Sequence, residues 1–191
     1  LIGESKNLDT GDQRLCEIIQ NQSVRMNGVI ENVLQLSRRK TAEPRPLDID
    51  QWIKDFLLEF TAGFSQAPLI EVDMDIQTSI QADPLHLSQV LSNLLENGLR
   101  YSEKNTGELK VKIVGGVNSR TQLPFIEVID YGEGVKEELR SSLFEPFYTT
   151  EATGTGLGLY LSKELCEANN ASLIYSQAAT GGSSFRITFL K

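Results

Sequence analysis

The sequence predicts an α+β protein: a two-layer sandwich of a mixed, mostly antiparallel sheet with helices on one face, preceded by one long helix. Two observations predict this class. From about residue 43 onward, strand and helix patterns do not alternate one for one, which argues against a fully parallel sheet. Before that point, apolar residues recur at helical spacing only. We therefore expect two parts, residues 1–42 and 43–191.

The composition is that of a folded protein and excludes several classes. The 191 residues suit one domain with an appendage, and 40% apolar with 23% charged residues argue against disorder. A net charge of −8 argues against direct nucleic-acid binding, which needs a basic face. A bound polyanion would therefore have to be held by local dipoles, a metal ion and a few cations. The sequence contains no run of 18 apolar residues, so we expect no membrane span within it.

The first part predicts a helix of about seven turns that begins at a capping box formed by Thr10 and Gln13. Its narrow apolar stripe favours packing against a partner helix over packing on its own domain. A basic cluster closes the helix at 38–40, and Pro44 and Pro46 then form a stiff linker. The stripe consists of Leu15, Ile18, Ile19, Gln22, Met26, Val29, Val33 and Leu36.

The second part predicts the elements of the sandwich. Asp83 and Pro84 cap a strong helix expected over 85–101. The remaining expected helices are 47–64 and 160–168, and the expected strands are 69–75, 79–82, 109–115, 125–130, 171–176 and 183–190.

The glycine run at 154–159, Gly-Thr-Gly-Leu-Gly-Leu, leads directly into the expected helix at 160–168. Such a run leaves free backbone N–H groups at the positive end of a helix dipole, which predicts an anion site, most often for phosphate. A flexible turn is the alternative. The P-loop and dinucleotide folds fit poorly, because there the glycines follow the first strand of a βαβ unit.

Four polar side chains gather on one face of the helix expected over 85–101. Asn93 and Asn97 lie four residues apart, with Arg100 and Tyr101 nearby, on a helix that is otherwise apolar. Buried amides need polar partners, and an amide oxygen suits Mg²⁺, which prefers few protein ligands and keeps water and phosphate oxygens. A solvent-exposed polar face is the alternative.

Asp130 ends an apolar row of a strand and is followed by Gly132 and Gly134. A carboxylate in an apolar slot accepts well from an amino group such as that of adenine, and the glycines would let the backbone approach the ring. A plain turn or a metal loop is the alternative. The segment 144–150 is expected to be a loop with aromatic anchors that closes over a ligand, or an ordinary surface loop. The glycine turn at 181–185 is expected to be a hairpin turn.

Taken together and in this order, the motifs resemble the ATP-binding domain of sensor histidine kinases, in the superfamily that includes gyrase, Hsp90 and MutL. The resemblance covers about residues 47–191. It includes an N box (93–102), a first glycine box (130–134), an F box (144–148) and a second glycine box (154–159). It implies the Bergerat-type ATP-binding fold. The first part also resembles the second helix of a dimerisation and histidine-phosphotransfer hairpin.

The resemblance implies roles for these residues, with ATP and Mg²⁺ as cofactors. Asn97 would bind Mg²⁺, Asp130 would read the adenine amino group, and the reaction would be transfer of the γ-phosphoryl group of ATP to a histidine. Asn93, Arg100 and Tyr101 would line the phosphate and ribose side. The remaining expected nucleotide-binding residues are Gly132, Gly134, Phe147, Thr149, Thr150, Gly154, Thr155, Gly156, Leu157, Gly158 and Leu159.

The short lid, the two threonines and the linker resemble the nitrogen-regulator and type IV pilus (PilS-like) sensor kinases. That resemblance implies a homodimeric full-length kinase, a response regulator that activates transcription as partner, control of type IV pili or a related system, and a cytoplasmic portion of a protein anchored in the bacterial inner membrane. The alternatives are an ATPase of the superfamily that phosphorylates no protein, and an interaction module of the same fold that has lost the nucleotide.

The sequence departs from the family pattern at three positions. The only histidine, His86, lacks the acidic neighbour of a phosphoacceptor, so we expect the acceptor to precede Leu1 and this chain not to autophosphorylate. Many relatives have Lys where this chain has Glu151, whose carboxylate would repel ATP unless it points to solvent. We predict that Glu151→Lys tightens ATP binding. Gly98 replaces the usual Ala, at a cost to the helix of up to about 1 kcal/mol.

Overall fold

A computed structural model describes residues 10–37, 42–74, 79–151 and 154–190 of the chain. Two expectations lie outside these residues: the basic cluster at 38–40 and the end of the strand expected at 69–75. The same holds for the side chains of Val29, Val33 and Leu36.

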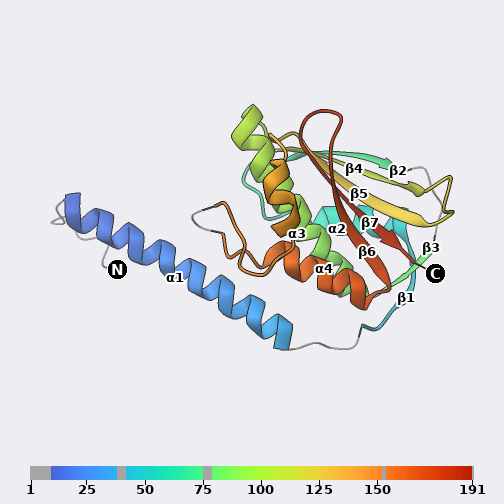
Figure 1. Ribbon diagram of the computed structural model, residues 1–191, viewed down its shortest axis with the longest axis horizontal. Coiled ribbons are helices and arrows are strands. Elements are labelled where there is room, and N and C mark those ends of the chain that lie inside the picture. The colour runs from blue at the N-terminus through green and yellow to red at the C-terminus, as the bar shows by residue number, and fades with distance from the viewer. Residues whose placement is uncertain (1–9, 38–41, 75–78, 152–153, 191) are drawn as a thin grey trace.

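The long helix α1, Thr10–Ser37, confirms the expected seven turns. It extends beside the sandwich and stands apart from its core (Figure 1). Five apolar side chains of α1 are 47–64% exposed, so the described part of its stripe is not buried within this chain. They are Leu15, Ile18, Ile19, Met26 and Ile30.

A five-stranded sheet forms one layer of the sandwich, in the order β2-β4-β5-β7-β6. Only β2 and β4 are parallel, and the other neighbouring pairs are antiparallel. The expectation of a mixed, mostly antiparallel sheet is therefore confirmed. The strands are β2 Leu69–Met74, β4 Lys110–Val117, β5 Pro124–Asp130, β6 Ala171–Gln177 and β7 Ser183–Phe189.

Three helices, α2 Ile49–Thr61, α3 Pro84–Thr106 and α4 Gly158–Ala168, form the second layer on one face of this sheet (Figure 1). The apolar side of α3 is fully buried, because Leu91, Leu95 and Leu99 lie at helical spacing and pack against the sheet. Asp83 caps α3 by accepting from the backbone N–H of Leu85, and Gly107 ends it in the left-handed region at φ 79°.

Two short elements differ from expectation. Residues 45–48 form strand β1, Arg45–Asp48, which pairs with β3, Ser79–Ala82, so the helix expected from residue 47 begins only at Ile49. Four residues that include Pro46 carry no periodic signal, and their pairing partner lies more than 30 residues away. A 3₁₀ helix, η1 Glu137–Ser142, was also not expected.

Candidate functional site

A chain of side-chain hydrogen bonds runs along the polar face of α3. The Arg100 guanidinium donates to Asn97 Oδ1 at 2.7 Å, and Asn97 Nδ2 donates to Asn93 Oδ1 at 3.4 Å. Asn93 Nδ2 in turn donates to Ser162 Oγ at 2.9 Å, on α4. The two amides are half-buried and face α4, so this face of α3 is not simply a solvated polar surface.

The first turn of α4 lies directly against Asn93. A Cβ atom built at Gly158 would lie 2.2 Å from Asn93 Oδ1, so only glycine allows this approach. Ser162 Oγ donates back to the Gly158 carbonyl at 2.9 Å, which completes the link between the two helices. Because Leu157, the N-cap of α4, provides no side-chain cap, the backbone N–H groups of the first turn remain available to an anion.

The segment that precedes α4 is here called the lid, and its described residues are 144–151 and 154–157. Gly156 has φ 69°, and a Cβ atom there would lie 2.4 Å from the backbone carbonyl carbon of Phe147. Phe144 anchors the lid through an edge-on contact with Phe185, whose ring centroid is 6.5 Å away. Phe147, by contrast, is 64% exposed.

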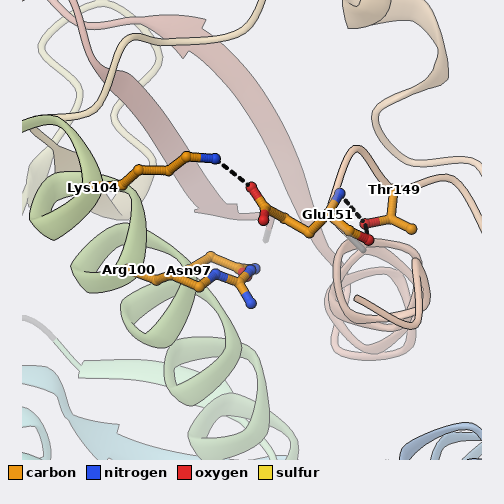
Figure 2. A network of polar contacts seen from close by, with 5 residues as sticks. All are labelled: Asn97, Arg100, Lys104, Thr149 and Glu151. Atoms are coloured by element: carbon orange, nitrogen blue, oxygen red, sulfur yellow. Dashed lines mark hydrogen bonds and ion pairs between the residues drawn. The ribbon is translucent and has the colours of Figure 1, made fainter. Parts of the chain in front are cut away.

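Glu151 and Thr149 lie in the lid opposite α3 (Figure 2). The Glu151 carboxylate forms an ion pair of 3.2 Å with Lys104 Nζ, one turn of α3 beyond Arg100. The Glu151 N–H donates to Thr149 Oγ1 at 3.1 Å. The carboxylate therefore neither points freely to solvent nor lies unpaired beside the site. Thr150 is exposed.

Asp130 lies at the end of β5 and is 3% exposed. Its Oδ1 accepts from the backbone N–H groups of Gly132 at 2.9 Å and Ser183 at 2.8 Å. Burial raises the pKa of the Asp130 carboxyl above its ordinary value, and these hydrogen bonds only partly offset that effect. Since a carboxylate has about four lone pairs, Asp130 can still accept from a ligand donor.

The surroundings of Asp130 bring together segments that are distant in sequence. Gly182 packs so closely that a Cβ atom there would lie 2.2 Å from the Asp130 carbonyl oxygen. On the other side, the buried Ser102 of α3 accepts from the Tyr131 N–H at 2.9 Å, and Gly132 packs on Tyr101. The hairpin turn expected at 181–185 is therefore part of this site.

Sequence reasoning missed four participants: Lys104, Ser162, Gly182 and Ser183. Gly182 and Ser183 had a signal, because both lie in the glycine turn at 181–185. Lys104 and Ser162 had none, because each meets its partner only across a sequence separation of more than 45 residues. Of the expected residues, Thr155 lies beside Gly28 of α1, and Leu157 is buried. His86 lies near the start of α3 and contacts Asn169. The distance between Nδ1 of His86 and Nδ2 of Asn169 is 3.1 Å.

The model of one protein family, described as histidine kinase-, DNA gyrase B- and HSP90-like ATPase, matches residues 82–191. The chain belongs to this ATPase family. The match covers α3, both ends of the site and the lid, and it confirms the family resemblance and the fold class that the motifs predict.

Among curated relatives, the sensor protein kinase PilS of Pseudomonas aeruginosa is 50% identical over 192 residues, which cover 99% of this chain and 36% of that protein. The chain spans 26–36% of the length of the first three curated relatives it matches.

Two solved structures show the same fold. The histidine kinase AdeS of Acinetobacter baumannii superimposes with a TM-score of 0.69 at 26% identity, over 96% of this chain and 87% of that one. Full-length ShkA in complex with AMPPNP superimposes with a TM-score of 0.71 at 19% identity, over 98% of this chain and 40% of that one.

Within the described residues, no helix is both long and apolar enough to cross a membrane.

Proposed function

We propose that residues 43–191 form the ATP-binding catalytic domain of a sensor histidine kinase, and that residues 1–42 belong to its dimerisation and phosphotransfer hairpin. The domain binds ATP between α3, the lid and the glycine turn at 181–182. It transfers the γ-phosphoryl group to a histidine, from which the group passes to a response-regulator aspartate.

One observation carries this proposal. A buried carboxylate, Asp130, lies at one end of α3's polar side, and an uncapped helix N-terminus at Gly158 lies at the other. Asn93, Asn97 and Arg100 connect the two along α3. A nucleotide needs this combination: an acceptor for its amino group, and dipoles and a cation for its phosphates.

The chain's residues fit Mg²⁺ only together with a phosphate ligand. Within the described ranges, no cluster of three His, Cys, Asp or Glu side chains could hold a metal ion alone. Asn97 Oδ1 lies on the polar face of α3 and accepts from a cation, the Arg100 guanidinium. Asn97 would therefore supply one ligand, and Mg²⁺, when bound, neutralises charge on the phosphates.

In this reaction the chain contributes positioning and charge, not covalent chemistry. Asp130 fixes the adenine ring, and the first turn of α4 donates its N–H groups to the phosphates. The rest of the site is expected to be lined by Tyr101, Phe147, Thr149, Thr150 and the glycines. Asn93 is held by Ser162 and offers no carboxylate to activate water, which disfavours the alternative of a simple ATPase.

For the full-length protein, we base our proposals on the relatives of this chain. We propose that the full-length protein is a homodimer with a cytoplasmic kinase portion and a membrane anchor, and that it signals to a response regulator that activates transcription. The 50% identity to PilS favours control of type IV pili or a related system. The exposed apolar stripe of α1 supports dimerisation, because it needs a partner helix.

Calorimetric titration with ATP, with and without Mg²⁺, tests the nucleotide site. We expect saturable binding that is tighter with Mg²⁺, and an absence of binding would contradict the proposal and favour the degenerate module. Incubation with γ-labelled ATP should leave this chain unlabelled, whereas a chain extended to include the acceptor hairpin should become labelled. Label on His86 would contradict the assignment, and release of phosphate without transfer would favour the ATPase.

A further inference from the structure

Within the described part of the chain, strand β6 pairs only with β7 and therefore forms one edge of the five-stranded sheet. Two backbone hydrogen bonds that flank β6 show which of its residues bond to β7. The Ala178 N–H donates to the Gly182 carbonyl at 2.8 Å. At the other end, the Leu190 N–H donates to the Asn170 carbonyl at 2.9 Å. Because backbone groups of successive residues point to opposite sides of a strand, the even-numbered residues of β6 bond to β7.

The odd-numbered residues of β6, which include Leu173, Tyr175 and Gln177, therefore turn their backbone N–H and C=O groups toward the open edge. Such an edge is a template on which another extended chain can pair, unless charges or proline protect it. The opposite edge strand, β2, carries the acidic Glu71 and Asp73. Since β6 contains neither a charged residue nor a proline, it is the edge that is open to a further strand.

A groove with a volume of about 580 Å³ runs along this edge, between β6, η1 and α4. The charged side chains among its described lining are two cations, Arg140 of η1 and Lys163 of α4. Lys163 is exposed, and its Nζ lies 5.7 Å from the ring centroid of Phe144, which lines the same groove. Neither cation forms an ion pair with a described carboxylate. The groove is therefore a locally basic site in a chain with a net charge of −8.

The Arg140 guanidinium is held in place beside the β6 edge. Its Nε donates to the Val135 carbonyl at 3.1 Å, and its Nη2 donates to Gln177 Oε1 at 2.8 Å. It also lies over the ring of Tyr175, 5.7 Å from the centroid. These contacts use only part of the N–H donors of a guanidinium, so Arg140 can still donate to a carboxylate.

We propose that the β6 edge is a docking surface for an extended, acidic segment of another protein, which adds to the sheet as a further strand. The backbone of the segment bonds to Leu173 and Tyr175, and its acidic side chains, at every second position, contact Arg140 and Lys163. The side chains between them are apolar and lie beside Ile174, which is 52% exposed.

Charge distinguishes this partner from a second copy of the chain. Pairing two β6 strands edge to edge would bring the cations of one groove close to those of the other, and like charges repel. An acidic segment instead neutralises both cations, and the net negative charge of the chain disfavours its binding elsewhere.

Residue-resolved hydrogen exchange of the full chain tests the proposal, with a blocked octapeptide of alternating glutamate and valine as the probe. We expect the Leu173 and Tyr175 amides to exchange about 10-fold more slowly when about 90% of the chain is bound, because only the free edge exchanges. The Ile174 amide, which bonds to β7, should change little, and exchange in β2 should not change.

Two changes to the octapeptide separate charge from strand pairing. Lysine in place of glutamate should weaken binding at least about 10-fold, because the cations of the groove repel it. N-methylation of one alternate set of residues should abolish binding, and methylation of the other set should preserve it. Only alternate amides of an added strand face its neighbour.

Lys163→Glu tests the charge on the protein side. Lys54→Glu is the matched control, because it makes the same charge change on α2, outside the groove. We expect Lys163→Glu to weaken binding of the acidic octapeptide about 5-fold, and Lys54→Glu to change it by less than about 2-fold. Equal effects of the two substitutions would contradict the acidic assignment.

Three further results would overturn the proposal. The first is an absence of binding of the acidic octapeptide, and the second is equal binding after methylation of either set, which would show charge attraction without strand addition. The third is protection of the Leu173 and Tyr175 amides in the free chain that rises with its concentration, which would show that a second copy occupies the edge. All of these results are independent of ATP binding, so they leave the proposed function untouched.

Discussion

Two parts of the candidate site are held in different ways. At the Asp130 end, a side chain that is 3% exposed is fixed by two backbone N–H groups, and the surrounding glycines leave no space for a Cβ atom. Between α3 and the lid, by contrast, Glu151 contributes one ion pair between side chains that are 24% and 70% exposed. The first arrangement is fixed by backbone groups, whereas the second depends on two side chains that can change partners.

This difference suggests that the two parts have different roles in binding. Backbone donors cannot change partners without moving the chain, so the Asp130 end suits recognition of a constant group such as adenine. Exposed ionic contacts change partners at little cost, so the contact between Glu151 and α3 can break and form again. Substitutions in the two parts should therefore have separable effects on binding.

The largest expected effect is that of Asp130→Asn. The amide retains Oδ1 as an acceptor for Gly132 and Ser183, but it would turn a donor toward the adenine amino group. We expect ATP affinity to fall about 100-fold, the scale for a lost hydrogen bond to a charged group, and calorimetry would measure it. A change of less than about 3-fold would remove Asp130 from the binding site.

The same variant should not lose stability at neutral pH. Because the folded-state pKa of Asp130 is raised, folding takes up a proton, and the stability of the parent falls as pH increases from about 4 through the folded-state pKa. Asp130→Asn removes this fall. Urea unfolding at acidic and neutral pH would check it, and a variant markedly less stable than the parent at pH 7 would contradict the predicted sign.

Gly158→Ala should have the next largest effect, and it acts where α4 meets Asn93. The added Cβ atom would overlap Asn93 Oδ1, so we expect a loss of about 1–3 kcal/mol in the free energy of unfolding, together with weaker ATP binding. Gly63→Ala is the matched control, because a Cβ atom there would contact nothing within 4 Å. Equal effects of the two substitutions would contradict the close approach.

Gly98→Ala should have the smallest effect, and its sign depends on Val111. A Cβ atom at residue 98 would lie 2.8 Å from Val111 Cγ1, which offsets the gain in helix propensity of about 1 kcal/mol. We expect Gly98→Ala to lower the stability of the parent slightly and to raise that of the Val111→Ala background, as measured by urea unfolding. Stabilisation of the parent chain would show that the contact is not limiting.

Local patterns in the sequence predicted much of the fold and of the site. The spacing of Asn93 and Asn97 places both on one face of α3, and the alternation around Val128 places Asp130 at the inner end of a strand. The Lys104–Glu151 pair had no local signal, because its partners are 47 residues apart and any exposed lysine has many possible partners. Phe147 was expected among the nucleotide-binding residues, and it has φ 65° and is 64% exposed.

The most direct test of the proposed nucleotide site is a titration of adenosine against the parent chain, Asp130→Asn and Asn97→Ala. Adenosine contains the group that Asp130 is proposed to read and lacks the phosphates on which Asn97 is proposed to act through Mg²⁺. The account predicts saturable binding to the parent, the same affinity for Asn97→Ala, and loss of binding to Asp130→Asn. Adenosine affinity that is unchanged in Asp130→Asn, or reduced in Asn97→Ala, would contradict it.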